Sequence, residues 1–324
     1  MKIRYWCVLS MAVIFLFPVQ GILAQGTNAV SFAIIGDYGL AGTPLSDVAT
    51  VVKSWAPGFI VTVGDNNYPS GAAATIDANI GQYYHDYIYP YTGAYGAGAT
   101  TNKFYPIPGN HDWYTANAQP YLDYFTLPGN ERYYEFVLGP VHFFMLDSDT
   151  NEPDGYTSGS TQALWLQNAL AASTSRWNLV LCHHAPYSSG SVHGSTAYMQ
   201  WPFEAWGADA VFSGHEHTYE RVLQGSFPYF VNGLGGDSKY TFGTPVSGSQ
   251  VRYSADYGAM RVEATDEFIT FEFITRGDVV VDTYTLLGAP PRRVNFQPFA
   301  SDIPEGWVLG DASAHGFRGD YGWQ

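Results

Sequence analysis

The sequence is poor in charged residues, and in basic residues above all. Charged side chains make up 13% of its 324 residues, with 14 Lys and Arg against 29 Asp and Glu, so the formal net charge is −15. Binding to nucleic-acid phosphates requires a basic surface, and this composition therefore argues against a nucleic-acid partner. A hydrophobic content of 46% also excludes an acidic disordered chain, because that many apolar side chains can fill a large core.

Long apolar runs are also scarce. The one clear run, residues 8–17, follows two basic residues and precedes Pro18 and several small residues. This order is typical of a secretory signal peptide, and we predict that residues 1–24 are removed on export, which makes the protein secreted or periplasmic. A membrane anchor is the alternative, but the run is short for a bilayer and ends at a proline. We expect no stable membrane insertion after cleavage.

Cysteine is nearly absent. Cleavage after residue 24 would remove Cys7 and leave only Cys182. A single thiol forms no internal disulfide, so packing and any bound metal must hold the fold. We interpret Cys182 as a small buried apolar residue rather than a metal ligand.

Short apolar segments recur along the chain, and each ends at a turn with polar side chains. They cover 30–35, 59–63, 104–108, 141–146, 178–181 and 210–213. Helical periodicity over 43–55 and 161–172 lies between some of them, which is the α/β pattern with functional groups beyond the carboxyl ends of strands. Further segments between 257 and 286 predict antiparallel strands that close the domain.

The polar side chains after these segments suit a metal site. Carboxylates can bridge two cations, an amide oxygen can bind one, and imidazoles add nitrogen donors, a mixture that suits Fe, Mn or Zn better than Ca or Mg. Two such ions can activate a water and bind a phosphoryl oxygen together. Each dipeptide alone is a weak signal, whereas the ordered set is far more specific.

Taken in order, five segments resemble the signatures of the calcineurin-like metallophosphoesterases. They are Gly36-Asp37-Tyr38-Gly39, Gly64-Asp65-Asn66-Asn67-Tyr68, Gly109-Asn110-His111-Asp112, Val180-Leu181-Cys182-His183 and Gly214-His215-Glu216-His217. Tyr68, three positions after Asp65, narrows the resemblance to the purple acid phosphatases. The resemblance covers roughly residues 30–287 and implies a four-layer α/β/β/α sandwich, with the metals where loops leave the strands.

The resemblance also implies which residues hold two metal ions. The first ion, expected to be Fe(III), would bind Asp37, Asp65, Tyr68 and His217. The second, expected to be Fe, Zn or Mn, would bind Asn110, His183 and His215, with Asp65 as the bridge. A phenolate from Tyr68 is a hard anionic ligand that would stabilise Fe(III) over Fe(II).

Two further histidines would be catalytic by the same resemblance. His111 would contact the phosphate and protonate the leaving group, and His193 would also face the substrate, together with Asn110. The assignment of His193 depends on a loop of variable length. His184, directly after His183, is expected to be structural, with a substrate contact as the alternative.

The implied activity is that of a secreted acid phosphatase. It would hydrolyse small phosphate monoesters by direct attack of a metal-bound hydroxide. One alternative is a metallophosphoesterase acting on phosphodiesters or nucleotides. Another, a non-enzyme, is a polysaccharide-associated binding protein with a degenerate site, although every expected ligand position is filled.

For the other polar residues near the motifs we predict structural roles. Asp147 and Asp149 are expected to cap a strand end rather than to form a catalytic pair. Arg221 is expected to form an ion pair with Glu220 or another acid.

We place the catalytic domain at residues 25–289. Residues 290–324 would be a linker and the possible start of a truncated β-sandwich module, malectin-like or otherwise carbohydrate-binding, that could contact polysaccharide. A C-terminal extension packed on the catalytic domain is the alternative.

Overall fold

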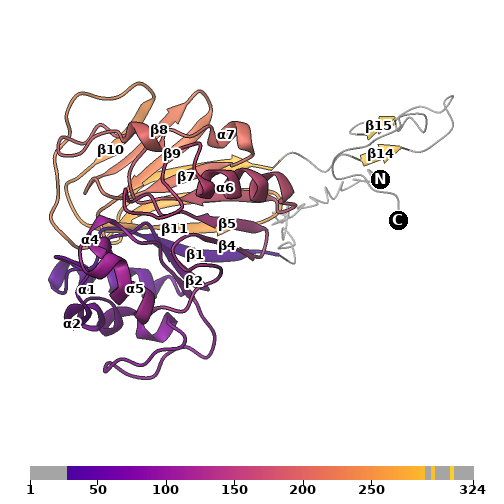
Figure 1. Cartoon of the computed structure of the whole chain (residues 1–324). Helices are drawn as coiled ribbons and strands as arrows, with labels where there is room; N and C mark the ends of the chain where they lie inside the picture. The colour runs from indigo at the N-terminus through magenta and orange to yellow at the C-terminus, as the bar shows by residue number, and fades with distance from the viewer. Residues whose placement is uncertain (1–27, 289–292, 296–306, 310–324) are drawn as a thin grey trace, which may run out of the picture.

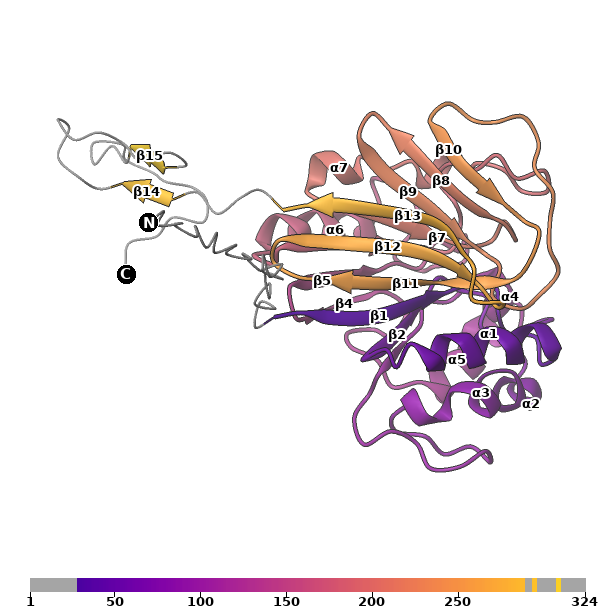
Figure 2. The ribbon, with the colours of Figure 1, turned by 180° about the vertical axis from the view of Figure 1, so that it is seen from behind.

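Two β-sheets that pack face to face form the centre of the structure (Figure 1 and Figure 2). This computed structural model describes residues 28–288, 293–295 and 307–309. The first sheet has the order β13 (Val280–Leu287), β12 (Phe268–Thr275), β11 (Gly258–Ala264), β1 (Val30–Ile35), β2 (Phe59–Thr62) and β3 (Phe104–Tyr105). The second has the order β10 (Ser249–Tyr253), β8 (Tyr219–Gln224), β9 (Phe227–Asn232), β7 (Ala210–Ser213), β6 (Trp177–Leu181), β5 (Val141–Met145) and β4 (Tyr134–Leu138).

Each sheet contains a parallel part and an antiparallel part. Strands β1, β2 and β3 are parallel, as are β5, β6, β7 and β9. The predicted antiparallel set is confirmed, because β11 pairs with β1 and β12, and β12 pairs with β13. The predicted metal-binding residues follow the carboxyl ends of β1, β2 and β3 in one sheet, and of β6 and β7 in the other.

Helices cover the outer faces of the sheets. The two predicted helices are confirmed as α1 (Thr43–Ser54) and α6 (Thr161–Ala172). Helix α6 is capped by Ser160, the residue before its first turn, whose hydroxyl accepts a hydrogen bond from the Ala163 amide at 3.2 Å. The shorter helices are α2 (Ala73–Ile76), α3 (Gln82–Tyr84), α4 (Asn110–Trp113), α5 (Gln119–Tyr124) and α7 (Phe203–Trp206). Single 3-10 turns occupy His85–Tyr87, Ala116–Ala118 and Ala197–Met199, and a π-helical turn occupies Asp77–Gly81.

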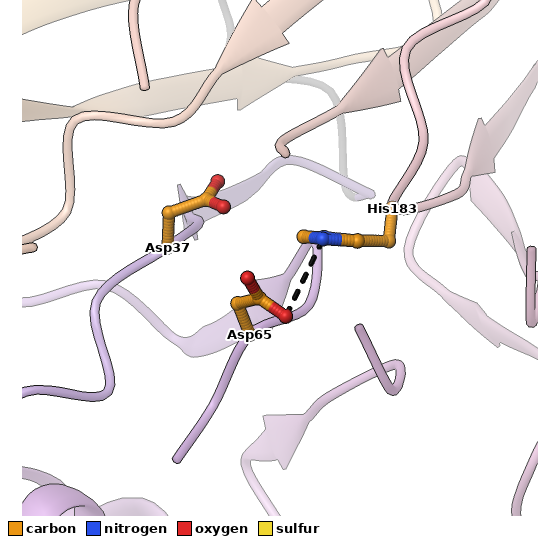
Figure 3. A group of neighbouring side chains, drawn as sticks. All are labelled: Asp37, Asp65 and His183. Carbon is orange, nitrogen blue, oxygen red and sulfur yellow. Dashed lines mark ion pairs between the residues drawn. The ribbon is translucent and has the colours of Figure 1, made fainter. Parts of the chain in front are cut away.

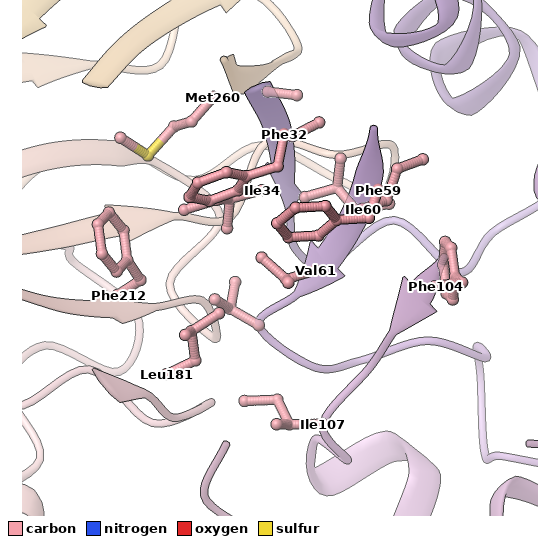
Figure 4. Packing of buried hydrophobic residues seen from close by; sticks show 14 of the residues in the cluster. Phe32, Ile34, Phe59, Ile60, Val61, Phe104, Ile107, Leu181, Phe212 and Met260 are labelled. Carbon is pink, nitrogen blue, oxygen red and sulfur yellow. The ribbon is translucent and has the colours of Figure 1, made fainter. Parts of the chain in front are cut away.

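The central strands of the second sheet, β5, β6 and β7, are mostly apolar on both faces, and both faces are covered. In β5, Phe143 belongs to the cluster between the sheets, while Phe144 belongs to the cluster beneath α6 and α7. Aromatic contacts join the sheets, with ring centroids of Phe32 and Phe143 5.1 Å apart and those of Phe230 and Phe271 5.2 Å apart. Figure 4 shows part of the cluster between the sheets. These layers confirm the predicted α/β/β/α sandwich.

The remaining predictions concern Cys182, membrane insertion and the two ends of the chain. Cys182 is a buried free thiol in the cluster beneath α6 and α7, as expected. None of the described helices has the length and apolar character that a bilayer crossing requires. The predicted signal peptide, residues 1–24, lies outside the described residues. In the C-terminal segment, β14 (Arg293–Asn295) pairs in parallel with β15 (Trp307–Leu309), and the truncated module stays a prediction.

Candidate metal centre

The turns after three strands have an unusual backbone conformation. Asp37 after β1, Asp65 after β2 and His215 after β7 adopt φ values of +52°, +53° and +68°. Such values are uncommon for residues other than glycine, and they cluster at functional sites. Contacts between the turns hold this geometry, because the His215 amide donates to both carboxylate oxygens of Asp37 at 3.0 Å.

One group of donor atoms surrounds the hydroxyl of Tyr68. This oxygen lies 2.8 Å from Asp65 Oδ2, 3.4 Å from Asp37 Oδ1 and 3.1 Å from His217 Nε2. All four side chains are buried. We call these the Tyr68 group; they are the residues predicted for the first metal.

A second group surrounds the imidazole of His183. Its Nε2 atom lies 3.0 Å from Asn110 Oδ1 and 3.4 Å from Asp65 Oδ1. The ring of His215 is beside it, with centroids 5.0 Å apart. We call Asn110, His183, His215 and Asp65 the His183 group; they are the residues predicted for the second metal.

Asp65 belongs to both groups through different oxygens. Its Oδ2 atom accepts a hydrogen bond from the Tyr68 hydroxyl, while its Oδ1 atom faces His183. Figure 3 shows Asp37, Asp65 and His183 pointing toward one another from separate elements. One donor atom from each of these three residues lies within 4.8 Å of the others. The Asp65 carboxylate therefore has the orientation that a bridging ligand needs.

Hydrogen bonds to backbone carbonyls orient two of the imidazoles. Nδ1 of His183 lies 2.8 Å from the Val63 carbonyl oxygen, and Nδ1 of His217 lies 2.8 Å from that of Ser238. A carbonyl only accepts, so each Nδ1 carries the hydrogen, and Nε2 of the neutral ring presents its lone pair to the site. That is the tautomer a metal ligand requires.

The electrostatics of both groups fit cations. Burial raises the pKa of Tyr68 well above 10, and the charges of Asp65 and Asp37 raise it further. Tyr68 would therefore become a phenolate only beside a positive charge. Burial alone would lower the pKa of His183, but Asp65 outweighs it and raises that pKa to about 10. Carboxylates, a phenol, an amide oxygen and imidazoles together suit iron, zinc or manganese.

The two predicted catalytic histidines lie against different groups. Nδ1 of His111 donates to the Pro69 carbonyl at 2.6 Å, so its Nε2 faces the site, 3.9 Å from Asp65 Oδ2. The exposed His193 stacks on His215, with ring centroids 3.9 Å apart. The structure thus brings all the predicted site residues together, while their catalytic roles stay predictions.

The structure also shows the contacts of His184, Asp147 and Arg221, for which the sequence predicted structural roles. His184 is buried, its Nδ1 lies 2.9 Å from the Ser148 hydroxyl, and burial followed by the charge of His183 lowers its pKa to about 3. Asp147 accepts from the Asp149 amide at 2.9 Å just after β5, which confirms the expected cap. Arg221 pairs with an acid as expected, and this acid is Asp282, at 2.8 Å.

Three residues near the site make contacts that the sequence did not lead us to predict. Tyr240 stacks on His217, with centroids 4.2 Å apart and planes 5° apart, and nothing in its sequence context indicates this. Tyr114 accepts a hydrogen bond from Asn110 Nδ2 at 2.7 Å, and its position four residues later on a helical turn could have suggested the contact. Glu216 is completely buried, and its place between His215 and His217 was the available signal.

Comparison with known proteins defines the class. Residues 30–219 match the family Calcineurin-like phosphoesterase, and because this is more than half of the chain, the protein belongs to that family. The residues of both donor groups, described above, lie within the matched range. Together with the relatives described next, the fold supports a metal-dependent phosphoester hydrolase.

The relatives confirm the resemblance to purple acid phosphatases. The chain is 25% identical to Purple acid phosphatase 17 of Arabidopsis thaliana over 245 residues, which cover 65% of this chain and 70% of the relative. It is 24% identical to Tartrate-resistant acid phosphatase type 5 of Rattus norvegicus over 271 residues, which cover 71% and 80%.

Solved structures share the fold at lower identity. Purple acid phosphatase PPD1 from yellow lupin seeds has a TM-score of 0.65 and 18% identity, covering 80% of this chain and 54% of that one. GAP50, described as the anchor in the inner membrane complex of Plasmodium, has a TM-score of 0.63 and 20% identity, covering 81% and 90%. At these identities, the likeness concerns the fold alone.

Proposed function

We propose that the protein is a secreted acid phosphatase that hydrolyses phosphate monoesters at a binuclear metal centre. The Tyr68 group would hold Fe(III), and the His183 group would hold Fe, Zn or Mn. The observation that carries this proposal is the Asp65 carboxylate, whose two oxygens face the two donor groups. A carboxylate shared in this way supports a pair of ions rather than one.

The bound ions would supply charge neutralisation for the phosphoryl oxygens and an activated water. The protein's own residues would do the remaining work. His111 is anchored through Nδ1, so its Nε2 can donate a proton to the leaving oxygen beside the Tyr68 group. His193 would hold the phosphate from the side of the His183 group, where it stacks on His215.

The visible spectrum of the purified protein tests the metal assignment. A phenolate bound to Fe(III) gives a charge-transfer band, so the wild-type protein should be purple and Tyr68→Phe should lose the band. Tyr83→Phe is the matched control, because this hydroxyl contacts the Gly42 amide away from the donor groups. A colourless, iron-free but active wild-type enzyme would contradict the ferric assignment and favour another branch of the family.

Substrate class is tested by parallel assays at acidic pH. Aryl and alkyl phosphate monoesters should be hydrolysed at least about tenfold faster than the corresponding diesters and than nucleoside triphosphates, whose terminal bond is an anhydride, judged by kcat/KM. Preference for a diester would favour the alternative phosphoesterase activity. Bound metal without turnover of any ester would favour the non-enzymatic binding protein.

Export and polysaccharide contact form separate parts of the proposal. The basic, apolar and small-residue order of residues 1–24 supports a cleaved signal peptide. The first residues of the exported protein, determined by N-terminal sequencing, should lie near position 25.

The proposed polysaccharide contact is tested by co-sedimentation of the protein with insoluble polysaccharide. Co-sedimentation that is lost on deletion of residues 290–324 would support the contact, and equal sedimentation of both forms would contradict it.

A further inference from the structure

Glu216 is a completely buried acid in the turn between His215 and His217. Its side chain has no exposed surface, and no Lys, Arg or His forms an ion pair with it in the part of the chain that the structure describes. Burying a carboxylate is unfavourable unless strong hydrogen bonds compensate it. The partners of Glu216 therefore indicate what this residue does.

Those partners are two consecutive backbone amides. The Val192 amide donates to Glu216 Oε1 at 2.9 Å, and the His193 amide donates to Oε2 at 2.8 Å. Charge-assisted bonds of this kind are stronger than neutral ones, and two of them fix both position and direction. Gly190 leaves the necessary space, since a Cβ atom there would overlap the Glu216 side chain.

The loop that carries His193 is anchored differently at its base and at its tip. At the base, the Ser189 amide and hydroxyl bind Glu220, and the Ser191 amide donates to the Thr241 carbonyl at 2.9 Å. At the tip, the backbone amides of the exposed residues Val192 and His193 donate to Glu216, and the His193 ring stacks on His215. Glu216 thus links this tip to the turn that carries His215 and His217.

We propose that Glu216 is a positioning residue that holds His193 in place to bind the substrate phosphate. This inference rests on the proposed function and deepens it. The two amide bonds hold the backbone at 193, so that the imidazole lies on His215 at the edge of the His183 group. Without the two amide bonds, the loop tip would become ordered only when the substrate binds, and the entropy lost in ordering it would weaken substrate binding.

The test compares Glu216→Gln with the wild-type enzyme. A carboxamide has one acceptor oxygen and one donor nitrogen, so it can satisfy only one of the two amides. We expect KM for a phosphate monoester, and Ki for inorganic phosphate, to rise about tenfold, with kcat changed less than KM. Metal content and the Tyr68 absorption band should stay unchanged. Glu204→Gln, an exposed acid on α7, should behave like the wild type.

Two further measurements separate positioning from a general structural role. In a His193→Ala background, Glu216→Gln should raise KM no further, because its effect passes through His193. Hydrogen–deuterium exchange of residues 186–196 should be faster in Glu216→Gln than in the wild type, without any substrate present. Additive effects on KM, or unchanged exchange, would overturn the proposal.

The outcomes also distinguish this inference from the proposed function. If the wild-type enzyme hydrolyses monoesters and Glu216→Gln has the same KM, only the positioning role fails. If the wild type neither turns over esters nor binds phosphate, the function itself fails. Glu216→Asp, too short to reach both amides, provides a second variant with the same expected defect. Loss of the folded state in both variants would overturn the inference, since Glu216 would then serve the fold rather than His193.

Discussion

The turns that carry the metal donors and the loop that carries His193 are built on different principles. Asp37, Asp65 and His215 lie within three residues of a strand end, so the sheets fix their positions. His193 lies much farther from the end of β6, is exposed, and stands on a loop tip joined to Glu216. We therefore expect metal binding at the proposed centre to depend on the folded core, and the proposed phosphate contact of His193 to depend on a few local hydrogen bonds.

Asp65→Asn should give the largest effect, because the amide nitrogen would face one of the two donor groups. We expect loss of at least one metal ion per chain and a decrease in kcat/KM of about 1000-fold or more. Elemental analysis and steady-state kinetics measure both quantities. Asp47→Asn, which removes a half-buried partner of Arg276 away from the donor groups, is the control. Two retained ions with full activity would contradict the bridging role.

Asn66→Ala should lower the stability of the whole fold, because Asn66 lies in one of the turns that carry the metal donors and its side chain is buried in the core. The buried Asn66 side chain donates to Asp112 and to the Ile107 carbonyl, and it accepts from the Tyr38 hydroxyl. Removing it leaves several buried groups without partners, and we expect a loss of about 2–3 kcal/mol in the free energy of unfolding. Urea unfolding measures this, and an unchanged midpoint would contradict the idea that this network braces the turn.

His193→Ala should lower activity while leaving the stability of the fold almost unchanged. Because the side chain is exposed and stands on a loop, unfolding free energy should change by less than about 0.5 kcal/mol. Loss of a charged contact to phosphate should lower kcat/KM about 10- to 100-fold, mainly through KM, while both metal ions stay bound. Loss of metal in this variant would show that the two regions are not independent.

Tyr114→Phe should have the smallest effect. The Tyr114 hydroxyl accepts from Asn110 Nδ2, which keeps Asn110 Oδ1 toward His183. Without this acceptor the amide can rotate, but the exposed position lets water replace the hydroxyl. We expect a two- to fivefold loss of affinity at the second metal site, measured by competition with a chelator. An unchanged affinity would show that packing alone orients Asn110.

Much of the fold could be predicted because the signals are local. The apolar segments predicted at 30–35 and 210–213 are confirmed as β1 and β7 with the same bounds. The segment at 104–108 was too long, since β3 ends at Tyr105, before Pro106, which has no amide hydrogen to pair. Strand β8 was missed because Glu220 and Arg221 look solvent-exposed in sequence, whereas partners from other elements satisfy both.

The order of amino acids shows which donor types the site holds and that they follow strands, because residue chemistry and strand periodicity are properties of neighbouring positions. The folded chain is needed to show that the two oxygens of Asp65 face different groups and that Glu216 reaches the amides of the His193 loop. These arrangements depend on contacts between segments far apart along the chain, and their geometry is set by how the two sheets pack.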